Sequence, residues 1–169
     1  MTRSALPVAI GLGANLGDPL TAIHEAVRRL TAGGLGAVRL SPLFETSPVD
    51  CVPGTPLFIN AVVIGEWTGS PARLLRLCRQ VERQLGRPVR HSRREARVID
   101  VDILLIGNRV VAVSGLDAPH PRLLARRFAL EPLACLAPEW EIAGAGLTVS
   151  QALARLKKDA DAGTFRRLP

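Results

Sequence analysis

The sequence predicts an α+β fold of the ferredoxin-like type: an antiparallel sheet with helices on one face, followed by additional short C-terminal helices. Three observations support this fold class. Apolar runs of strand length alternate with two amphipathic helical patterns in the order β, α, β, β, α, β. Both helical patterns begin with a capping residue followed by proline. Apolar residues make up 47% of the 169 residues, which is enough to form the core of a single domain over 1–169.

The N-terminal part predicts a strand, a glycine-rich turn and a helix. Residues 7–13 are an apolar run that leads into the sequence GANLGD. Asp18 is the expected N-cap, Pro19 takes the first helical position, and apolar residues then recur at helical spacing as far as Leu30. Glycines at 33, 34 and 36 end this helix, and residues 37–45 predict a second strand.

The central part predicts a long loop, a strand and a second helix. Residues 46–56 are too rich in proline and glycine for regular structure and are long enough for a binding loop. Residues 57–66 return to strand character. Ser70 and Pro71 begin the second helix, whose apolar face continues to Leu85, and Gly86 ends it.

The C-terminal part begins with a basic segment, residues 87–97, and a further apolar strand, residues 98–107. Short helices are expected near residues 128–136 and 149–156. The final residues, 157–169, contain no motif, and no role is assigned to them.

Composition narrows the function classes. The three cysteines form no CxxC pair, so neither a disulfide framework nor a structural zinc site is expected, and a cytoplasmic location fits best. No apolar segment has the length needed to cross a bilayer, so no membrane partner is expected. No element has a surplus apolar face, so a monomer is expected. The net charge of +7 is compatible with an anionic ligand but does not identify one.

Asp100 and Asp102 are the most informative pair of polar residues. Side chains two apart on a strand point to the same face, so both carboxylates project together from an otherwise apolar run. Such a pair alone is more often the polar face of a half-exposed strand. In a buried strand, however, two unpaired carboxylates would repel each other and lose hydration. Magnesium prefers carboxylate oxygens together with substrate phosphates, so the pair predicts a magnesium site.

Two basic clusters flank this pair. Arg87, Arg97 and the arginines between them precede the aspartates, which is the charge pattern expected around a polyphosphate held by metal and guanidinium groups. His120 and Arg126 belong to a second cluster after the strand. A solvated basic loop is the commoner fate of the first cluster, and a lone histidine is more often structural than catalytic.

The sequence GLGANLG, residues 11–17, lies between a strand and a helix, where dinucleotide-binding folds carry GxGxxG. Its last spacing is one residue too long, and no acidic residue follows at the expected distance. A tight turn is therefore the favoured interpretation.

Several short motifs follow one another from about residue 8 to residue 140: GLGANLGD, SPLFETSPVD, PLFINAV, VERQLGR, RVIDVDI and PHPRLLARRF. In this order they resemble the motifs of the 6-hydroxymethyl-7,8-dihydropterin pyrophosphokinase family. The resemblance implies a ferredoxin-like fold with extra helices. It also implies transfer of a diphosphoryl group from ATP to the pterin hydroxymethyl oxygen, with AMP leaving and two Mg²⁺ ions bound by Asp100 and Asp102.

The resemblance further implies residues that contact ATP. Arg87 and Arg97 correspond to arginines that grip the phosphates and act with the two aspartates in catalysis. Glu82 corresponds to a helix carboxylate near the nucleotide, and His120 and Arg126 to contacts with the α or β phosphate. For Glu82 and Arg126 the alternative is an exposed ion pair, which contributes little.

For the pterin, the resemblance implies that Phe58 and Phe128 sandwich the ring. Asn60 and Thr46 would hydrogen-bond the amide edge, together with the backbone near Val49. Two phenylalanines alone are more often core residues, whereas an asparagine within an apolar strand is harder to explain without a ligand.

The chain departs from the family in three places. Relatives often carry tryptophan and Gly-Pro where this chain has Arg94, Glu95 and Ala96. They also often have tyrosine at Phe58 and serine at Ala14. These differences bear on how the 87–97 loop closes, and they leave the two aspartates unchanged.

Two other function classes remain as alternatives. A nucleic-acid-binding module has the same element order and a positive charge, but its sheet needs exposed aromatic residues where this strand has carboxylates. We therefore expect no nucleic-acid partner. An oxidoreductase that binds a dinucleotide would rest on the glycine turn alone.

Overall fold

The structure is a computed structural model that describes residues 4–86, 97–156 and 163–169. Its main sheet has six strands in the order β10-β3-β4-β1-β5, with β2 also paired with β4, and all of these pairs are antiparallel. The strands are β1 (Leu6–Ala14), β2 (Gly36–Leu40), β3 (Phe44–Thr46), β4 (Phe58–Trp67), β5 (Asp100–Ile106) and β10 (Phe165–Arg167).

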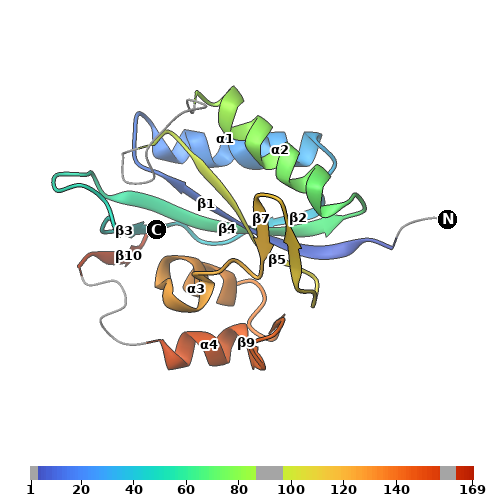
Figure 1. Cartoon of the computed structure of the whole chain (residues 1–169). Coiled ribbons are helices and arrows are strands. Elements are labelled where there is room, and N and C mark those ends of the chain that lie inside the picture. The colour runs from blue at the N-terminus through green and yellow to red at the C-terminus, as the bar shows by residue number, and fades with distance from the viewer. Residues whose placement is uncertain (1–3, 87–96, 157–162) are drawn as a thin grey trace.

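Helices lie on both faces of this sheet, so the described chain has three layers (Figure 1). The long helices α1 (Pro19–Ala32) and α2 (Pro71–Gln84) cover one face, as expected from the sequence. The short helices α3 (Arg127–Ala134) and α4 (Val149–Arg155) pack on the other. The remaining elements are a 3-10 turn and two hairpins: η1 (Leu123–Ala125), β6 (Val111–Val113) with β7 (Leu116–Ala118), and β8 (Glu141–Ile142) with β9 (Leu147–Thr148).

The predicted starts of both long helices are confirmed. The Asp18 carboxylate accepts a hydrogen bond from the Thr21 amide (3.1 Å), and the Ser70 hydroxyl accepts one from the Arg73 amide (3.3 Å). Each side chain thus satisfies an amide that has no partner within its helix. Gly86 lies two residues beyond α2 with a φ of +92°, a conformation that glycine adopts without strain.

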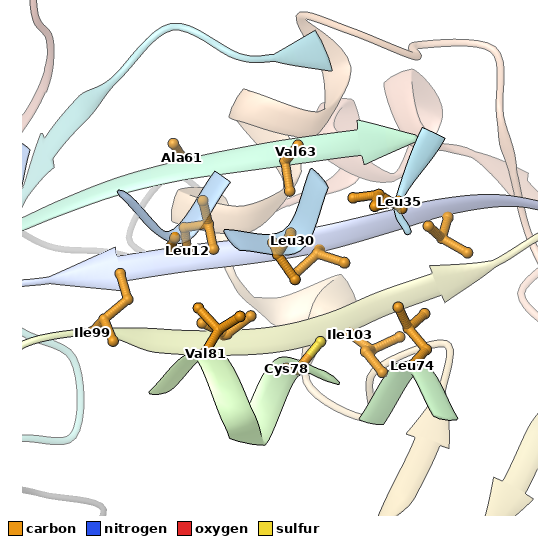
Figure 2. Packing of buried hydrophobic residues seen from close by; sticks show 14 of the residues in the cluster. Leu12, Leu30, Leu35, Ala61, Val63, Leu74, Cys78, Val81, Ile99 and Ile103 are labelled. Carbon is orange, nitrogen blue, oxygen red and sulfur yellow. The ribbon is translucent and has the colours of Figure 1, made fainter. Parts of the chain in front are cut away.

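Strand alternation divides the apolar residues between the two faces. Val8, Ile10 and Leu12 of β1 point towards α1 and α2, where they meet the buried helical face formed by Leu74, Cys78 and Val81 of α2 (Figure 2). Burial raises the pKa of the Cys78 thiol well above its ordinary value, with smaller contributions from Glu82 and Asp102, so the thiol stays protonated as part of the core.

The prediction of one strand over residues 37–45 is wrong, because the chain forms β2 and β3 with a break between them. Pro42 has no amide hydrogen with which to continue a ladder. Ser41 closes the gap: its amide donates to the Val62 carbonyl, and its hydroxyl accepts from the Val62 amide, both at 2.9 Å.

The C-terminal segment, for which the sequence indicated no role, contains β10. This strand pairs with β3 and forms one edge of the sheet, while β5 forms the other. Within the segments that the structure describes, no helix combines the length and apolar character that a membrane crossing requires.

Replacing Leu30 with alanine tests the packing of α1. Leu30 is fully buried, so Leu30→Ala should lower the free energy of unfolding by about 2–5 kcal/mol. Leu20 lies on the same helix with 44% of its surface exposed, so Leu20→Ala should change it by less than about 0.5 kcal/mol. Urea denaturation of both variants measures the difference; equal losses would show that α1 does not pack as described.

Candidate functional site

A row of residues across three strands forms the floor of the candidate site. Asp100 on β5 lies opposite Gly13 on β1, and Gly13 lies opposite Asn60 on β4. One step along, Asp102 lies opposite Gly11. These residues share the sheet face that α3 and α4 cover further along, while Val101 between the aspartates is buried on the opposite face.

The glycines let neighbouring side chains approach β1 closely between the carboxylates and the amide. A Cβ atom on Gly13 would lie 2.8 Å from the Asn60 side-chain oxygen, closer than such atoms approach. Neighbouring strands are about 4.8 Å apart, so the Asp100 and Asn60 backbones are separated by roughly 10 Å, with only glycine between them.

Asp100 and Arg97 form an ion pair in which Nη1 and Oδ2 are 2.8 Å apart. The two carboxylates are therefore not both unpaired, as the argument from the sequence had assumed. Both side chains are largely shielded, with 15% of Arg97 and 23% of Asp100 exposed, so the pair is screened less than one at the surface. The Arg97 guanidinium carbon also lies 5.8 Å from the centre of the Phe58 ring. Arg97 thus reaches from the aspartates to the aromatic residue on β4.

Glu82 holds the backbone of the strand that carries the aspartates. Its Oε1 accepts a hydrogen bond from the Val101 amide (2.9 Å), at the outer edge of β5. This bond connects α2 to the residue between Asp100 and Asp102. It also satisfies a backbone amide that has no partner strand, because β5 is an edge strand of the sheet. Glu82 therefore supports the carboxylate pair through the backbone.

Arg126 and His120 follow the strand that carries the aspartates in the chain. Burial lowers the pKa of Arg126, as does neighbouring Arg122, whereas Asp102 and Asp100 act in the opposite direction. Arg126 is therefore within electrostatic reach of both carboxylates. The His120 amide donates to the Leu104 carbonyl (2.9 Å), and its Nδ1 accepts from the Arg122 amide (3.1 Å). In the neutral imidazole the proton is then on Nε2.

The polar residues expected at the pterin are brought together on β3 and β4. The buried Asn60 amide donates to the Thr46 hydroxyl (2.7 Å), so its carbonyl oxygen faces the space over Gly13. Phe58 lies two residues along the same face of β4. Phe128 lies on α3, with the Arg126 guanidinium carbon 5.2 Å from its ring centre. The two rings thus come from the sheet and from the helix layer that packs on it.

Two other expected residues stand apart. Val49 lies in the irregular segment between β3 and β4 with an exposed side chain, and its carbonyl accepts from the Cys51 thiol (3.4 Å). Arg87 lies outside the described residues, as does most of the 87–97 loop.

Asn15 is a site residue that the sequence analysis missed. Its side-chain oxygen accepts from the Arg97 amide (2.7 Å), and its side-chain amide donates to the Pro56 carbonyl (3.1 Å). It thus joins the start of β5 to the loop after β3. Asn15 is buried, and the signal available in the sequence was an asparagine in a turn directly after an apolar strand.

The carboxylate oxygens of Asp100 and Asp102 fit a divalent cation. Among the described residues, no group of three or more His, Cys, Asp and Glu side chains could hold a metal ion. Magnesium needs no such group, since one or two carboxylates with water and substrate phosphates complete its octahedral shell. The donor set therefore suits Mg²⁺ accompanied by a phosphorylated ligand better than a structural metal.

A groove of about 480 Å³ between α1 and α2 lies on the opposite side of the sheet. Its lining includes Arg28, Arg29, Arg73 and Arg76. Arg28 and Arg29 both bind Glu25 at 2.7 Å, and the groove contains neither the aspartates nor Asn60. We therefore place the candidate site at the carboxylates, where charge, aromatic rings and a buried amide converge.

Comparisons with known proteins show which family this chain resembles. The family model for 7,8-dihydro-6-hydroxymethylpterin-pyrophosphokinase (HPPK) matches residues 9–138. The 2-amino-4-hydroxy-6-hydroxymethyldihydropteridine pyrophosphokinase of Methylorubrum extorquens is 38% identical over 157 residues, which cover 92% of this chain and 94% of that protein. The protein of that name from Bacillus subtilis is 36% identical over 126 residues, 74% of each chain.

Several relatives are much longer than this chain. The mitochondrial folate synthesis bifunctional protein of Arabidopsis thaliana is 38% identical over 128 residues, 75% of this chain and 22% of that protein. The chain spans between 17% and 30% of the length of five such folate-synthesis relatives. A crystal structure of Plasmodium falciparum HPPK-DHPS covers 98% of this chain and 49% of its own with a TM-score of 0.74; at 15% identity it shows likeness of fold.

Replacing Asn15 tests the link between β5 and the loop after β3. Asn15→Ala removes the acceptor from the Arg97 amide, so the free energy of unfolding should fall by about 1–3 kcal/mol. Asn108→Ala is the control, because Asn108 hydrogen-bonds Glu141 in an exposed position and its loss should cost less than about 0.5 kcal/mol. Equal stabilities for the two variants, measured by urea denaturation, would contradict the bridging role.

Proposed function

The chain belongs to the 7,8-dihydro-6-hydroxymethylpterin-pyrophosphokinase family, and from this premise we propose that it transfers the diphosphoryl group of ATP to 6-hydroxymethyl-7,8-dihydropterin in folate synthesis. The observation that carries the proposal is the row from Asp100 through Gly13 to Asn60. It sets the Asp100 carboxylate and the buried Asn60 amide on the two sides of Gly13. ATP would lie over the aspartates and the pterin over the amide.

On the nucleotide side, we assign the two Mg²⁺ ions to Asp100 and Asp102, where they would neutralise phosphate charge and lower the pKa of the attacking hydroxyl. Arg97 binds Asp100, Arg126 lies within electrostatic reach of both aspartates, and these two guanidinium groups are proposed to bind the phosphates. Nε2–H of His120 is proposed to donate to an α- or β-phosphate oxygen. Arg87 is proposed to act beside Arg97.

Glu82 enters this proposal through the strand rather than through the nucleotide directly. Its hydrogen bond to the Val101 amide fixes the backbone between the metal-binding aspartates. Alignment of the reacting groups is the main contribution that a protein makes to phosphoryl transfer. Glu82 is therefore proposed to assist the reaction by orienting Asp100 and Asp102, the two proposed metal ligands.

On the pterin side, the Asn60 carbonyl and the Thr46 hydroxyl are proposed to bind the amide edge of the pterin. The backbone near Val49 is proposed to hydrogen-bond the same edge. Phe58 and Phe128 are proposed to cover the two faces of the ring. The pterin hydroxymethyl oxygen then attacks the β-phosphorus. The bond from that phosphorus to the α,β-bridging oxygen breaks, AMP leaves, and the hydroxyl proton passes to solvent.

We also propose that residues 1–169 form a single catalytic domain that acts as a cytoplasmic monomer. The fold is proposed to be ferredoxin-like, since the strand order β5-β1-β4-β2 and the intervening helices support that description. The proposal involves no membrane partner.

The two alternative functions are not supported. The sheet face at the site carries aspartates, which would repel nucleic-acid phosphates. Gly11 and Gly13 lie within β1 and not in a loop after it, so the glycine sequence does not form the phosphate-binding turn of a dinucleotide fold.

A labelling experiment tests the reaction itself. The protein is incubated with magnesium, the dihydropterin alcohol and ATP labelled in its γ phosphate. We expect label in the pterin product together with an equal amount of AMP, and neither product when the pterin is omitted. Formation of ADP, or of labelled free phosphate, would contradict diphosphoryl transfer.

Asp102→Asn tests the metal assignment with little change of shape. Turnover should fall more than about a hundredfold, because a charge that acts on the transferred group is lost. Asp117→Asn is the matched control, since Asp117 is exposed on β7, and its turnover should match that of the unaltered protein. Near-normal turnover by Asp102→Asn would show that this carboxylate does not hold a catalytic ion.

A further inference from the structure

We propose that Phe165 on the C-terminal strand β10 is a positioning residue that joins the two walls of the pterin subsite. The proposal rests on the function proposed above for the site itself. One wall consists of Thr46, Asn60 and Phe58 on β3 and β4. The other consists of Arg126 and Phe128 at the start of α3. The family model ends at residue 138, so β10 lies outside the segment that defines the family.

The first half of the connection is to β3. In the ladder between β10 and β3, Phe165 lies opposite Thr46. Hydrogen bonds continue on both sides: the Ser47 amide donates to the Thr164 carbonyl (2.9 Å), and the Leu168 amide donates to the Leu43 carbonyl (2.8 Å). The ring of Phe165 lies 5.3 Å from that of Phe44, whose cross-strand neighbour is Asn60. β10 thereby fixes the residue pair that carries the Thr46–Asn60 hydrogen bond.

The second half of the connection is to α3. The guanidinium carbon of Arg127 lies 4.0 Å from the centre of the Phe165 ring, a close cation–π contact. Arg127 is the first residue of α3, between Arg126 and Phe128, and its Nε binds the Glu131 carboxylate one turn later (2.6 Å). The orientation of Arg127 is thus fixed from both ends. Figure 1 shows β10 beside β3, with α3 next to it.

The entry of the chain into β10 is also closely fitted to β3. Gly163 has a φ of +124°, and a Cβ atom there would lie within 2.4 Å of the Ser47 hydroxyl oxygen. That hydroxyl accepts from the Thr164 amide (2.8 Å). Ser47 directly follows Thr46, so the tail is anchored where the irregular 47–57 segment leaves the sheet.

These contacts have a consequence for binding. If Phe165 no longer joined the walls, each wall would have to be ordered by the pterin when it binds, which weakens affinity without changing the chemical step. The alternative is that β10 only protects the edge of β3, as edge coverings do. If β10 only protects the edge, loss of Phe165 should destabilise the protein but should not affect the KM for one substrate more than the KM for the other.

Steady-state kinetics of full-length variants separates the two roles. For Phe165→Ala we expect the KM for the pterin to rise about tenfold, with the KM for ATP and kcat changed by less than about twofold. Phe165→Tyr retains the ring and should restore the pterin KM. Arg166→Ala is the matched control on the same strand, because it loses only the exposed ion pair with Glu45 and should leave both KM values unchanged.

Equal rises in both KM values, a fall in kcat alone, or the same effect from Arg166→Ala would overturn the proposal. Thermal melting of each variant shows whether it is folded at the assay temperature. If Phe165→Ala is unfolded at that temperature, Phe165→Leu replaces it, because leucine keeps apolar bulk but has no ring face. Phe165→Leu should raise only the KM for the pterin, and by less than about tenfold. An unchanged pterin KM in this variant would overturn the proposal.

Amide hydrogen exchange tests the same connection without turnover. In Phe165→Leu, segments 44–47 and 127–130 should both exchange faster than in the unaltered protein, while α1 should not change. Acceleration in only one of the two segments would contradict a link between the walls. If the unaltered protein makes no AMP, the proposed function fails, whereas the exchange result still decides the role of Phe165.

Discussion

The arrangement of the site depends on two carboxylates on one strand facing two glycines on the next. Asp100 and Asp102 cannot lie side by side in a partly buried position without compensating charge. The described residues supply part of it: Arg97 binds Asp100, and Arg126 lies within electrostatic reach of both. Gly11 and Gly13 place no side chain of β1 opposite the carboxylates, and in the proposed function a cation and a polyphosphate supply the rest.

The two faces of the sheet around this pair have different roles. The face towards α1 and α2 is a continuous apolar core, and it holds β1, β4 and β5 in register. On the opposite face, α3 and α4 cover a second apolar cluster. The same face carries the polar row, and Asn15, Glu82 and Phe165 attach neighbouring segments to the strands that form this row. None of the three lies in the row itself, yet each fixes a segment that contributes to it.

Much of the fold followed from local patterns. Asp18–Pro19 and Ser70–Pro71 identified both helix starts, and the spacing of Asp100 and Asp102 put both on one face because strand side chains alternate. The sequence was less informative where tertiary contacts decide. Pro42 divides an apolar run into two strands, β10 needs a distant edge to pair with, and the ion pair of Asp100 depends on where residue 97 enters the strand. The bridging role of Asn15 depends on a residue 82 positions away, which no local pattern reveals.

The central claim, that the aspartates hold the cations of a bound nucleotide, is tested most directly by crystallography with manganese in place of magnesium. Crystals grown with Mn²⁺, a non-hydrolysable ATP analogue and the pterin should show anomalous density within coordination distance of oxygens of both Asp100 and Asp102, in contact with the analogue's phosphates. Bound analogue with no anomalous density beside either aspartate would contradict the account.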